Sequence, residues 1–216
     1  MFKDIEKRIK SVFKLLHITP YPHHYATGTR GTLYEIANKT NRSPKMQIIK
    51  PNENYFDEYL KACKESFDNN IDEWKPFNPD HFDQWKSCIL SIYSDYENGV
   101  NIPEEMPRTY TYWCVENDTF IGEIQLRPFL NEIQAKTWGH IAYAIRYSKW
   151  NQGYGTQLLK KGLEKAKEFQ ISDVYIACHE SNIGSIKVIE KNNGQFINKV
   201  KESEDIMNNL YLIKNS

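Results

Sequence analysis

Residues 139–167 read GHIAYAIRYSKWNQGYGTQLLKKGLEKAK, and this stretch decides the fold of the chain around it. Residues 140–145 form an apolar run of strand type, the polar turn 146–152 leads to Gly153 and Gly155, and leucines then recur at helical spacing. The first N–H groups of a helix lack an intrahelical acceptor, and the helix dipole adds partial positive charge there. Glycine leaves no Cβ between the backbone and a phosphate. The stretch therefore predicts a site for a ligand that carries a diphosphate.

The glycine pair alone leaves other ligands and one structural explanation open. A dinucleotide-binding fingerprint requires a third glycine where Leu158 stands, and the acidic ribose partner expected about twenty residues later is not evident. A P-loop requires Gly-Lys-Ser/Thr at the helix start, where this chain has Gly155-Thr156-Gln157. The remaining alternative is a strand–turn–helix unit whose glycines serve packing only.

A second motif follows the first. The apolar run 174–178 ends at His-Glu-Ser-Asn in residues 179–182, and residues 183–194 then read IGSIKVIEKNNG. The loop 150–155 resembles the Q/R-x-x-G-x-G/A loop of the GNAT acetyltransferases. Residues 182–194 resemble the next motif of that family, N-x-x-A/S-x-x-x-x-x-K-N-G-G, at the expected distance.

The resemblance extends from about residue 46 to the C-terminus. Residues 106–132, MPRTYTYWCVENDTFIGEIQLRPFLNE, also resemble a bacterial branch of predicted acetyltransferases. The resemblance implies an α/β fold of GNAT type, with a mixed, mostly antiparallel central sheet and helices on both faces. It further implies acetyl-CoA as co-substrate, no metal, and direct transfer of the acetyl group to an amine of a small molecule or peptide in a ternary complex.

Two rival functions remain open. A GNAT-shaped module could bind acetyl-CoA without turnover, as a sensor or a partner subunit. A dinucleotide-binding oxidoreductase is the weaker alternative, and titration with NADH would reveal it.

Three segments hold the cofactor according to the resemblance. The strand ending at residue 145 offers backbone groups to the amide-bearing pantetheine arm, the glycine loop holds the pyrophosphate, and the next helix start contacts the pantetheine or a phosphate. The predicted cofactor-binding residues are Tyr143, Ala144, Ile145, Trp150, Asn151, Gln152, Gly153, Tyr154, Gly155, Thr156, Asn182 and Ser185. A plain helix cap is the structural alternative for Asn182.

The loop departs from the family pattern at its first position. Trp150 stands where the motif opens with Gln or Arg, so the group that often helps to bind the pyrophosphate is missing. Gln152, Lys149 or Arg146 could replace it, or the backbone amides suffice.

A second departure concerns the general acid. In many family members a tyrosine seven residues after the motif's asparagine protonates the departing thiolate, and this chain has Ile189 there. Other tyrosines, such as Tyr147 or Tyr143, or a solvent molecule remain as donors.

Two polar residues within otherwise apolar strands are the candidate general bases. An amine is protonated near neutral pH and becomes a nucleophile only after it loses that proton. The intrinsic pKa of histidine, about 6.5, suits His140 to this task. Glu123 shares one strand face with Gln125 and Arg127, because side chains alternate along a strand. A hydrogen-bonded structural role is the alternative for each candidate.

Composition excludes several other classes. The 216 residues carry 28 Lys and Arg against 28 Asp and Glu, so the net charge gives no reason to expect a nucleic acid partner. No apolar run approaches the length of a membrane span, and the N-terminus lacks a secretory core, which predicts a cytoplasmic protein. The cysteines at 63, 88, 114 and 178 are far apart, and reduced thiols are favoured over disulfides or zinc ligands.

Residues 1–44 form a predicted N-terminal extension, and residues 45–216 form the predicted GNAT acetyltransferase domain. An apolar stripe along residues 2–18 predicts an amphipathic helix that docks on the domain or bridges the subunits of a homodimer. A membrane surface is the alternative partner for this helix. The histidines at 17, 23 and 24 lack carboxylate or cysteine spacing, so no metal site is predicted.

Hydrophobic periodicity predicts the order of elements within the domain. Strands are expected at residues 47–49, 110–116, 120–127, 140–145, 174–178 and 209–213, and helices at 54–67, 79–96, from 156 onward, and 182–191. Asn117-Asp118 is the expected turn between the second and third strands. Aromatic residues at 74, 77, 82, 85, 110, 112 and 113 are expected either in the core or around an acceptor pocket. The family commonly builds acceptor specificity into the region that corresponds to residues 68–108.

Overall fold

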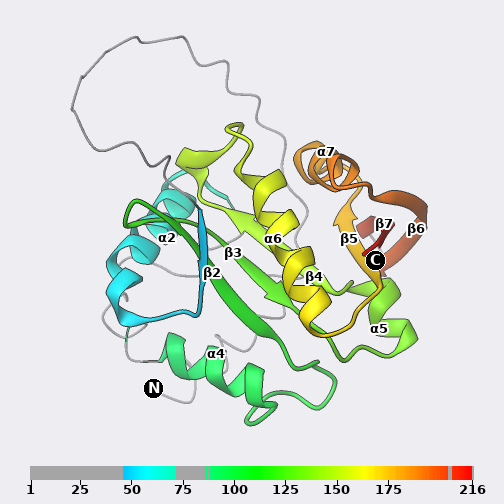
Figure 1. The fold of residues 1–216 in the computed structure, drawn as a ribbon, viewed down its shortest axis with the longest axis horizontal. Coiled ribbons are helices and arrows are strands. Elements are labelled where there is room, and N and C mark those ends of the chain that lie inside the picture. Colours follow the sequence, from blue (N-terminus) through cyan, green and yellow to red (C-terminus); the bar gives the residue numbers. More distant parts are fainter. Residues whose placement is uncertain (1–45, 72–85, 87, 204–205, 216) are drawn as a thin grey trace.

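The computed structural model describes residues 46–71, 86, 88–203 and 206–215. The predicted N-terminal helix, the three histidines near it and the aromatic residues 74, 77, 82 and 85 lie outside the described residues. Within them, strands form two antiparallel sheets with helices on both faces (Figure 1). The predicted α/β class with mostly antiparallel strands is confirmed.

The larger sheet has four strands in the order β1-β2-β3-β4. Their bounds are Gln47–Ile49, Tyr110–Glu116, Thr119–Leu126 and Ile141–Ile145, and all neighbours run antiparallel. A two-residue turn joins β2 to β3, and its residues Asn117 and Asp118 have φ values of 48° and 58°. These residues tolerate the left-handed region that such hairpin turns require, so the predicted turn is confirmed.

The smaller sheet has the order β5-β7-β6. Its strands span Asp173–His179, Ile206–Lys214 and Gln195–Ser203. The sequence predicted only one strand after the second motif, so the omission of β6 was wrong. Register shifts at Phe196/Asn198 and Lys201/Ser203 interrupt the alternation of side chains along β6, which hides the period-two signal of a strand.

Helices cover both faces of the larger sheet (Figure 1). On one face lie α2 and α4, which pack with Trp113 and Phe120 of the sheet into one core cluster. On the opposite face lies α6 (Figure 1). The bounds are Phe56–Asp68 for α2, Ile89–Asn98 for α4, Glu132–Thr137 for α5, Tyr154–Glu168 for α6 and Ile183–Lys191 for α7, with short 3-10 turns η1 at Glu53–Tyr55 and η3 at Tyr147–Lys149.

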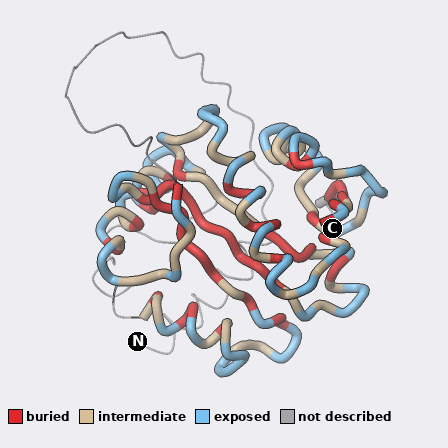
Figure 2. Tube along the Cα trace, in the orientation of Figure 1, coloured by how far each residue is buried: buried red, intermediate tan, exposed pale blue. Residues whose placement is uncertain are grey.

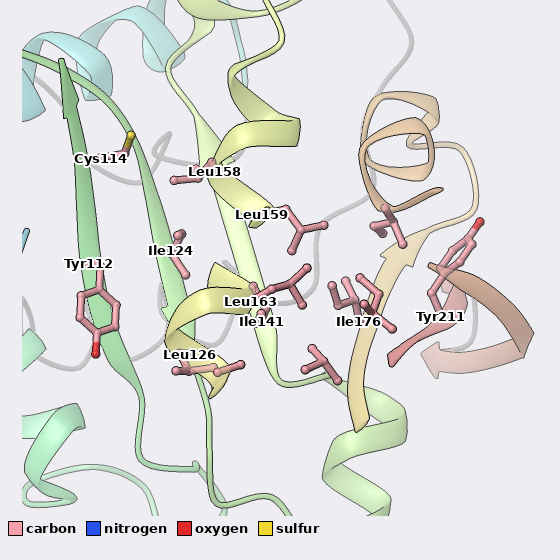
Figure 3. Close-up of a cluster of buried hydrophobic side chains, with 14 of the residues drawn as sticks. Tyr112, Cys114, Ile124, Leu126, Ile141, Leu158, Leu159, Leu163, Ile176 and Tyr211 are labelled. Atoms are coloured by element: carbon pink, nitrogen blue, oxygen red, sulfur yellow. The ribbon is translucent and has the colours of Figure 1, made fainter. Parts of the chain in front are cut away.

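The helix that follows the glycine loop joins the two sheets. Leu158, Leu159 and Leu163 of α6 share one buried cluster with strand residues of the larger sheet and with Ile176 and Tyr211 of the smaller one (Figure 3). Figure 2 shows that runs of buried residues follow the central strands beneath this helix. Burying such side chains contributes about 1.5–3 kcal/mol each, so α6 fixes the two sheets relative to each other.

The two sheets are hydrogen-bonded to each other beside β4. Gly139 and Ile176 form an isolated bridge, and the His140 N–H donates to the Tyr175 carbonyl at 2.7 Å. A Cβ at Gly139 would lie 2.8 Å from the Tyr175 carbonyl oxygen, so this close approach requires glycine. Beyond the bridge β4 and β5 belong to different sheets, which leaves the far end of β4 with an edge that faces α7 and the glycine loop.

Candidate functional site

A cavity of about 350 Å³ lies where the end of β4, the glycine loop and the start of α7 meet. All of the predicted cofactor-binding residues except Gln152 line it. The lining also includes Lys149, Gly184, Lys187, Val188 and Lys191. The structure thus brings together three segments that the sequence separates by up to about forty residues.

The cavity wall includes the N-terminus of α6. The first bond of this helix runs from the Gln157 N–H to the Gly153 carbonyl at 3.3 Å. The N–H groups of Tyr154, Gly155 and Thr156 therefore have no acceptor within the helix, and the helix dipole adds partial positive charge beside them. Together they form a site for an anion such as a phosphate.

The two glycines of the loop meet different needs. Gly153 has a φ of 83°, in the left-handed region, and a Cβ there would meet no atom within 4 Å. At Gly155 a Cβ would lie 3.0 Å from Val188 Cγ2 on α7. The packing explanation therefore fits Gly155, whereas Gly153 serves the backbone conformation at the open side of the loop.

Three lysines extend the positive charge of the cavity. Lys149, Lys187 and Lys191 line it, no carboxylate is among its lining residues, and none of the three makes an ion pair with a residue that the structure describes. Ammonium groups gathered in a concave surface together with a helix N-terminus favour a ligand with several negative charges. The sequence signal that marks Lys187 and Lys191 is their spacing of four residues, which places them on one face of α7.

The edge of β4 presents backbone groups to the same cavity. The Arg146 N–H donates to the Ile121 carbonyl at 2.9 Å, and the Arg127 N–H donates to the His140 carbonyl at 2.8 Å. Because backbone groups alternate in direction along a strand, the even-numbered residues of β4 bond to β3 and the odd-numbered ones face away. The N–H and C=O groups of Tyr143 therefore point toward the cavity, as an unpaired sheet edge.

The three side chains that could replace the Gln or Arg of the family loop differ in whether they reach the cavity. Arg146 donates to Glu58 Oε2 at 2.8 Å and pairs with Glu65 Oε1 at 2.6 Å, so its guanidinium is held on α2 away from the cavity. Gln152 donates to the Ser148 carbonyl at 2.9 Å and does not line the cavity. Of the three, Lys149 alone is a lining residue. Among these alternatives the geometry disfavours Arg146, because two carboxylates of α2 hold its guanidinium.

Asn182 is the N-cap of α7, which is the structural role given above as the alternative to cofactor binding. Its Oδ1 accepts the Ser185 N–H at 2.9 Å at the start of α7, and both residues also line the cavity. The cap orients the first turn of α7 toward the glycine loop.

Glu123 lies in a buried polar cluster under α4. It accepts hydrogen bonds from Tyr93 Oη at 2.7 Å, Trp113 Nε1 at 3.2 Å and Gln125 Nε2 at 2.9 Å. The last bond confirms that Glu123 and Gln125 share one strand face. Burial raises the pKa of Glu123. The carboxylate does not line the cavity, but its cross-strand partner is Ala144, which does.

His140 lies at the start of β4, away from the cavity-lining end of that strand. Its Nδ1 accepts the Tyr175 N–H at 3.1 Å, which places the proton of the neutral ring on Nε2. Burial, reinforced by the nearby charge of Arg127, lowers the pKa of His140. These contacts assign the ring a role in joining the two sheets, and its action as a base stays a prediction.

The described parts of the chain contain no group of three or more His, Cys, Asp or Glu side chains arranged to hold a metal ion. None of the helices in those parts is both long and apolar enough to cross a bilayer. All four cysteines are free thiols.

Comparison with protein families gives one match, to the model described as the Acetyltransferase (GNAT) domain, over residues 50–195. That is well over half of the chain. A search of curated protein sequences finds no significant match.

Solved structures with a similar fold include several acetyltransferases. An N-acetyltransferase from Staphylococcus aureus Mu50 is 16% identical with a TM-score of 0.53, and the match covers 80% of this chain and 99% of that one. RimL, the ribosomal L7/L12 alpha-N-protein acetyltransferase in complex with coenzyme A, is 14% identical with a TM-score of 0.59 and coverages of 78% and 93%. The microcin C7 self immunity acetyltransferase MccE, in complex with acetyl-CoA and AMP, is 12% identical with a TM-score of 0.59 and coverages of 78% and 92%. At these identities the likeness shows the shared fold alone.

Proposed function

Because the chain belongs to the GNAT acetyltransferase family, we propose that it transfers an acetyl group from acetyl-CoA directly to an amine of a small molecule or peptide. The observation that carries this proposal is the cavity, where the free N–H groups of a helix N-terminus and three lysines without a described carboxylate partner lie together. CoA carries a pyrophosphate and a further phosphate on its ribose, so it matches such a polycationic lining.

The cavity suggests how CoA would be held. The N–H groups of Tyr154, Gly155 and Thr156 would bind the pyrophosphate, with Lys149 beside them. The backbone groups of Tyr143 would bond to the amides of the pantetheine arm, as a neighbouring strand would. Asn182 and Ser185 would border the arm from α7, and the two lysines of that helix would contact phosphate oxygens.

Glu123 is the better placed of the two candidate bases. It is directly across the ladder from Ala144, a lining residue, whereas the Nδ1 of His140 is occupied by the Tyr175 N–H. A carboxylate with a raised pKa is a stronger base than a solvated one, and it can take the proton of the amine through one water. The freed amine then attacks the thioester carbonyl, and collapse of the intermediate breaks the C–S bond.

The thiols of the chain favour direct attack over an acetyl-cysteine intermediate. Burial raises the pKa of Cys178 to about 12, and it does the same for Cys114. A nucleophilic cysteine must be a thiolate, which these surroundings disfavour. Mass spectrometry after incubation with acetyl-CoA should therefore find no acetyl group on either thiol.

The alternative function is a non-catalytic acetyl-CoA sensor or partner module. The departures at Trp150 and Ile189 are the observations in its favour. A steady-state assay for free thiol, run with small amines and with peptides that have free α-amino groups, separates the two functions. The enzyme releases CoA with a suitable acceptor, whereas a sensor binds acetyl-CoA and releases none.

Calorimetry with acetyl-CoA tests the binding site itself. We expect the double variant Lys187→Ala, Lys191→Ala to bind acetyl-CoA about tenfold more weakly than the wild type and with a smaller dependence on salt. Lys160→Ala is the matched control, because Lys160 is an exposed lysine of α6 that does not line the cavity. Equal affinity of all three proteins, or tight binding of NADH in place of acetyl-CoA, contradicts the proposal.

A further inference from the structure

The sulfur that leaves CoA gains negative charge as the C–S bond breaks, and position 189 cannot stabilise it. Ile189 is fully buried in the core cluster beneath α6. Its side chain packs against Gly194, where an added Cβ would lie 2.3 Å from Ile189 Cγ2. This position of α7 is therefore a packed apolar site that offers no hydrogen-bond donor.

The tyrosines near the cavity differ in what their hydroxyls contact. Tyr147 packs on Trp150 with ring centroids 5.1 Å apart and does not line the cavity. Tyr154 lines the cavity, but its hydroxyl donates to Glu116 Oε2 at 2.6 Å. Tyr143 also lines the cavity, and among the described residues its hydroxyl makes no hydrogen bond to a carboxylate.

The hydroxyl of Tyr143 is held only weakly. It lies 3.4 Å from the Ser185 carbonyl oxygen, whereas O–H···O bonds usually span about 2.5–3.0 Å. The ring extends from β4 to the first turn of α7, so the hydroxyl sits between the strand edge and the helix that border the cavity. Burial raises the pKa of Tyr143, so its hydroxyl keeps its proton at neutral pH and can donate it to an acceptor.

We propose that Tyr143 is the hydrogen-bond donor that stabilises the departing CoA thiolate. The inference rests on the proposed function, because it requires that CoA lies along the β4 edge of the cavity. As the C–S bond of the tetrahedral intermediate breaks, the electron pair stays on sulfur, and the Tyr143 O–H turns from the Ser185 carbonyl to the sulfur.

The proton balance of this step is simple. The phenol is a weaker acid than the thiol, so its proton remains on oxygen while the thiolate leaves. The ammonium loses one proton through the general base before the attack, the nitrogen of the intermediate loses a second proton to solvent, and the thiolate takes one proton from solvent. The net reaction converts the protonated amine and acetyl-CoA into the amide, CoA-SH and one released proton, and Tyr143 is unchanged.

The test uses CoA itself, so no acceptor is needed. The pKa of the CoA thiol is measured by following the ultraviolet absorbance of the thiolate, free in solution and bound to each protein. Calorimetry first establishes that the wild type and each variant bind CoA. We expect the bound thiol to have a lower pKa than free CoA in the wild type, and Tyr143→Phe to raise it by about one pH unit.

Tyr147→Phe provides the control, since it removes a tyrosine hydroxyl from a ring outside the cavity lining and should leave the thiol pKa unchanged. An equal thiol pKa in the wild type and Tyr143→Phe, with CoA bound to both, overturns the role of Tyr143 and leaves the proposed function intact. A wild-type protein that binds no CoA overturns both. If Tyr143→Phe fails to fold, the wild type still decides, because a bound thiol no more acidic than free CoA contradicts the inference.

Discussion

The indole Nε1 of Trp150 donates a 2.7 Å hydrogen bond to the carbonyl oxygen of Ile145, the last residue of β4. Trp150 stands where the family loop opens with Gln or Arg, and here its polar atom ties the loop to the strand. Tyr147 packs edge-on against the same indole. The loop is thus anchored to the end of β4 before its glycines begin.

The Trp150 anchor can be tested with Trp150→Phe, which keeps an aromatic ring and removes the donor. The loss of this partly buried hydrogen bond should lower the free energy of unfolding by about 1 kcal/mol. Acetyl-CoA should bind several-fold more weakly, because the loop is less well ordered before binding. Chemical denaturation and calorimetry measure the two effects, and unchanged values for both would show that the bond does not order the loop.

The two loop glycines should respond differently to substitution. Gly153→Val places a β-branched side chain at a φ of 83° and between the backbone and the phosphate, so acetyl-CoA affinity should fall at least about tenfold. Gly153→Asn is the control for strain, because asparagine tolerates this conformation, and it should weaken binding with a smaller loss of stability. Calorimetry that shows wild-type affinity for Gly153→Val would refute the phosphate site.

For Gly155 the expected defect is one of packing. The Cβ of Gly155→Ala would lie 3.0 Å from Val188 Cγ2, so α6 and α7 must move apart. Overpacking of this kind costs about 1–3 kcal/mol, which a thermal melt detects as a lower melting temperature. A melting temperature equal to that of the wild type would mean that α7 shifts without cost.

General-base catalysis is tested once the amine panel provides an acceptor. Glu123→Gln should lower turnover by about 10²–10⁴-fold while acetyl-CoA affinity stays close to that of the wild type. His140→Ala should mainly lower stability, because it leaves the partly buried Tyr175 N–H without its acceptor. Unchanged turnover in the double variant Glu123→Gln, His140→Ala would eliminate both residues as bases.

Glu123 should also make stability depend on pH. Burial raises its pKa in the folded protein, so its contribution to stability is fully present below the unfolded pKa, about 4.3, and is lost as pH rises through the folded value. The free energy of unfolding of the wild type relative to Glu123→Gln should therefore fall with increasing pH. Urea denaturation across a pH series measures this difference, and a constant or rising difference contradicts it.

The N-terminal extension lies outside the described residues, and its docking remains a prediction. Its apolar stripe along residues 2–18 would be buried against the domain or a second subunit, at about 1.5–3 kcal/mol for each large side chain. A chain that starts at Lys45 should therefore melt earlier or change its mass in light scattering, while it keeps acetyl-CoA binding. The same mass and melting temperature as the full chain would show a loosely attached segment.

Short-range patterns in the sequence were sufficient for the elements that surround the site. The apolar, aromatic-rich runs of β2 and β3, the Asn117-Asp118 turn and the strand–glycine–helix order around Gly153 each depend on residues a few positions apart. Such patterns determine the local backbone conformation and the direction in which each side chain points. The elements therefore form wherever the fold buries their apolar side chains. They also predicted most of the cavity lining, because that lining is built from two short motifs.

The tertiary structure decided which polar groups are available to a ligand. Arg146 and Lys149 are equally plausible phosphate ligands by sequence, but Arg146 meets two carboxylates of α2 that lie more than eighty residues earlier. Glu123 is an isolated carboxylate in the sequence, but in the fold it accepts hydrogen bonds from three side chains. The register shifts of β6 likewise remove the periodic pattern by which a strand is predicted. Hydrogen-bond partners and burial depend on packing between segments that are distant in the sequence. These long-range contacts, rather than local preference, determine the pKa of each candidate side chain and whether it is available to a ligand.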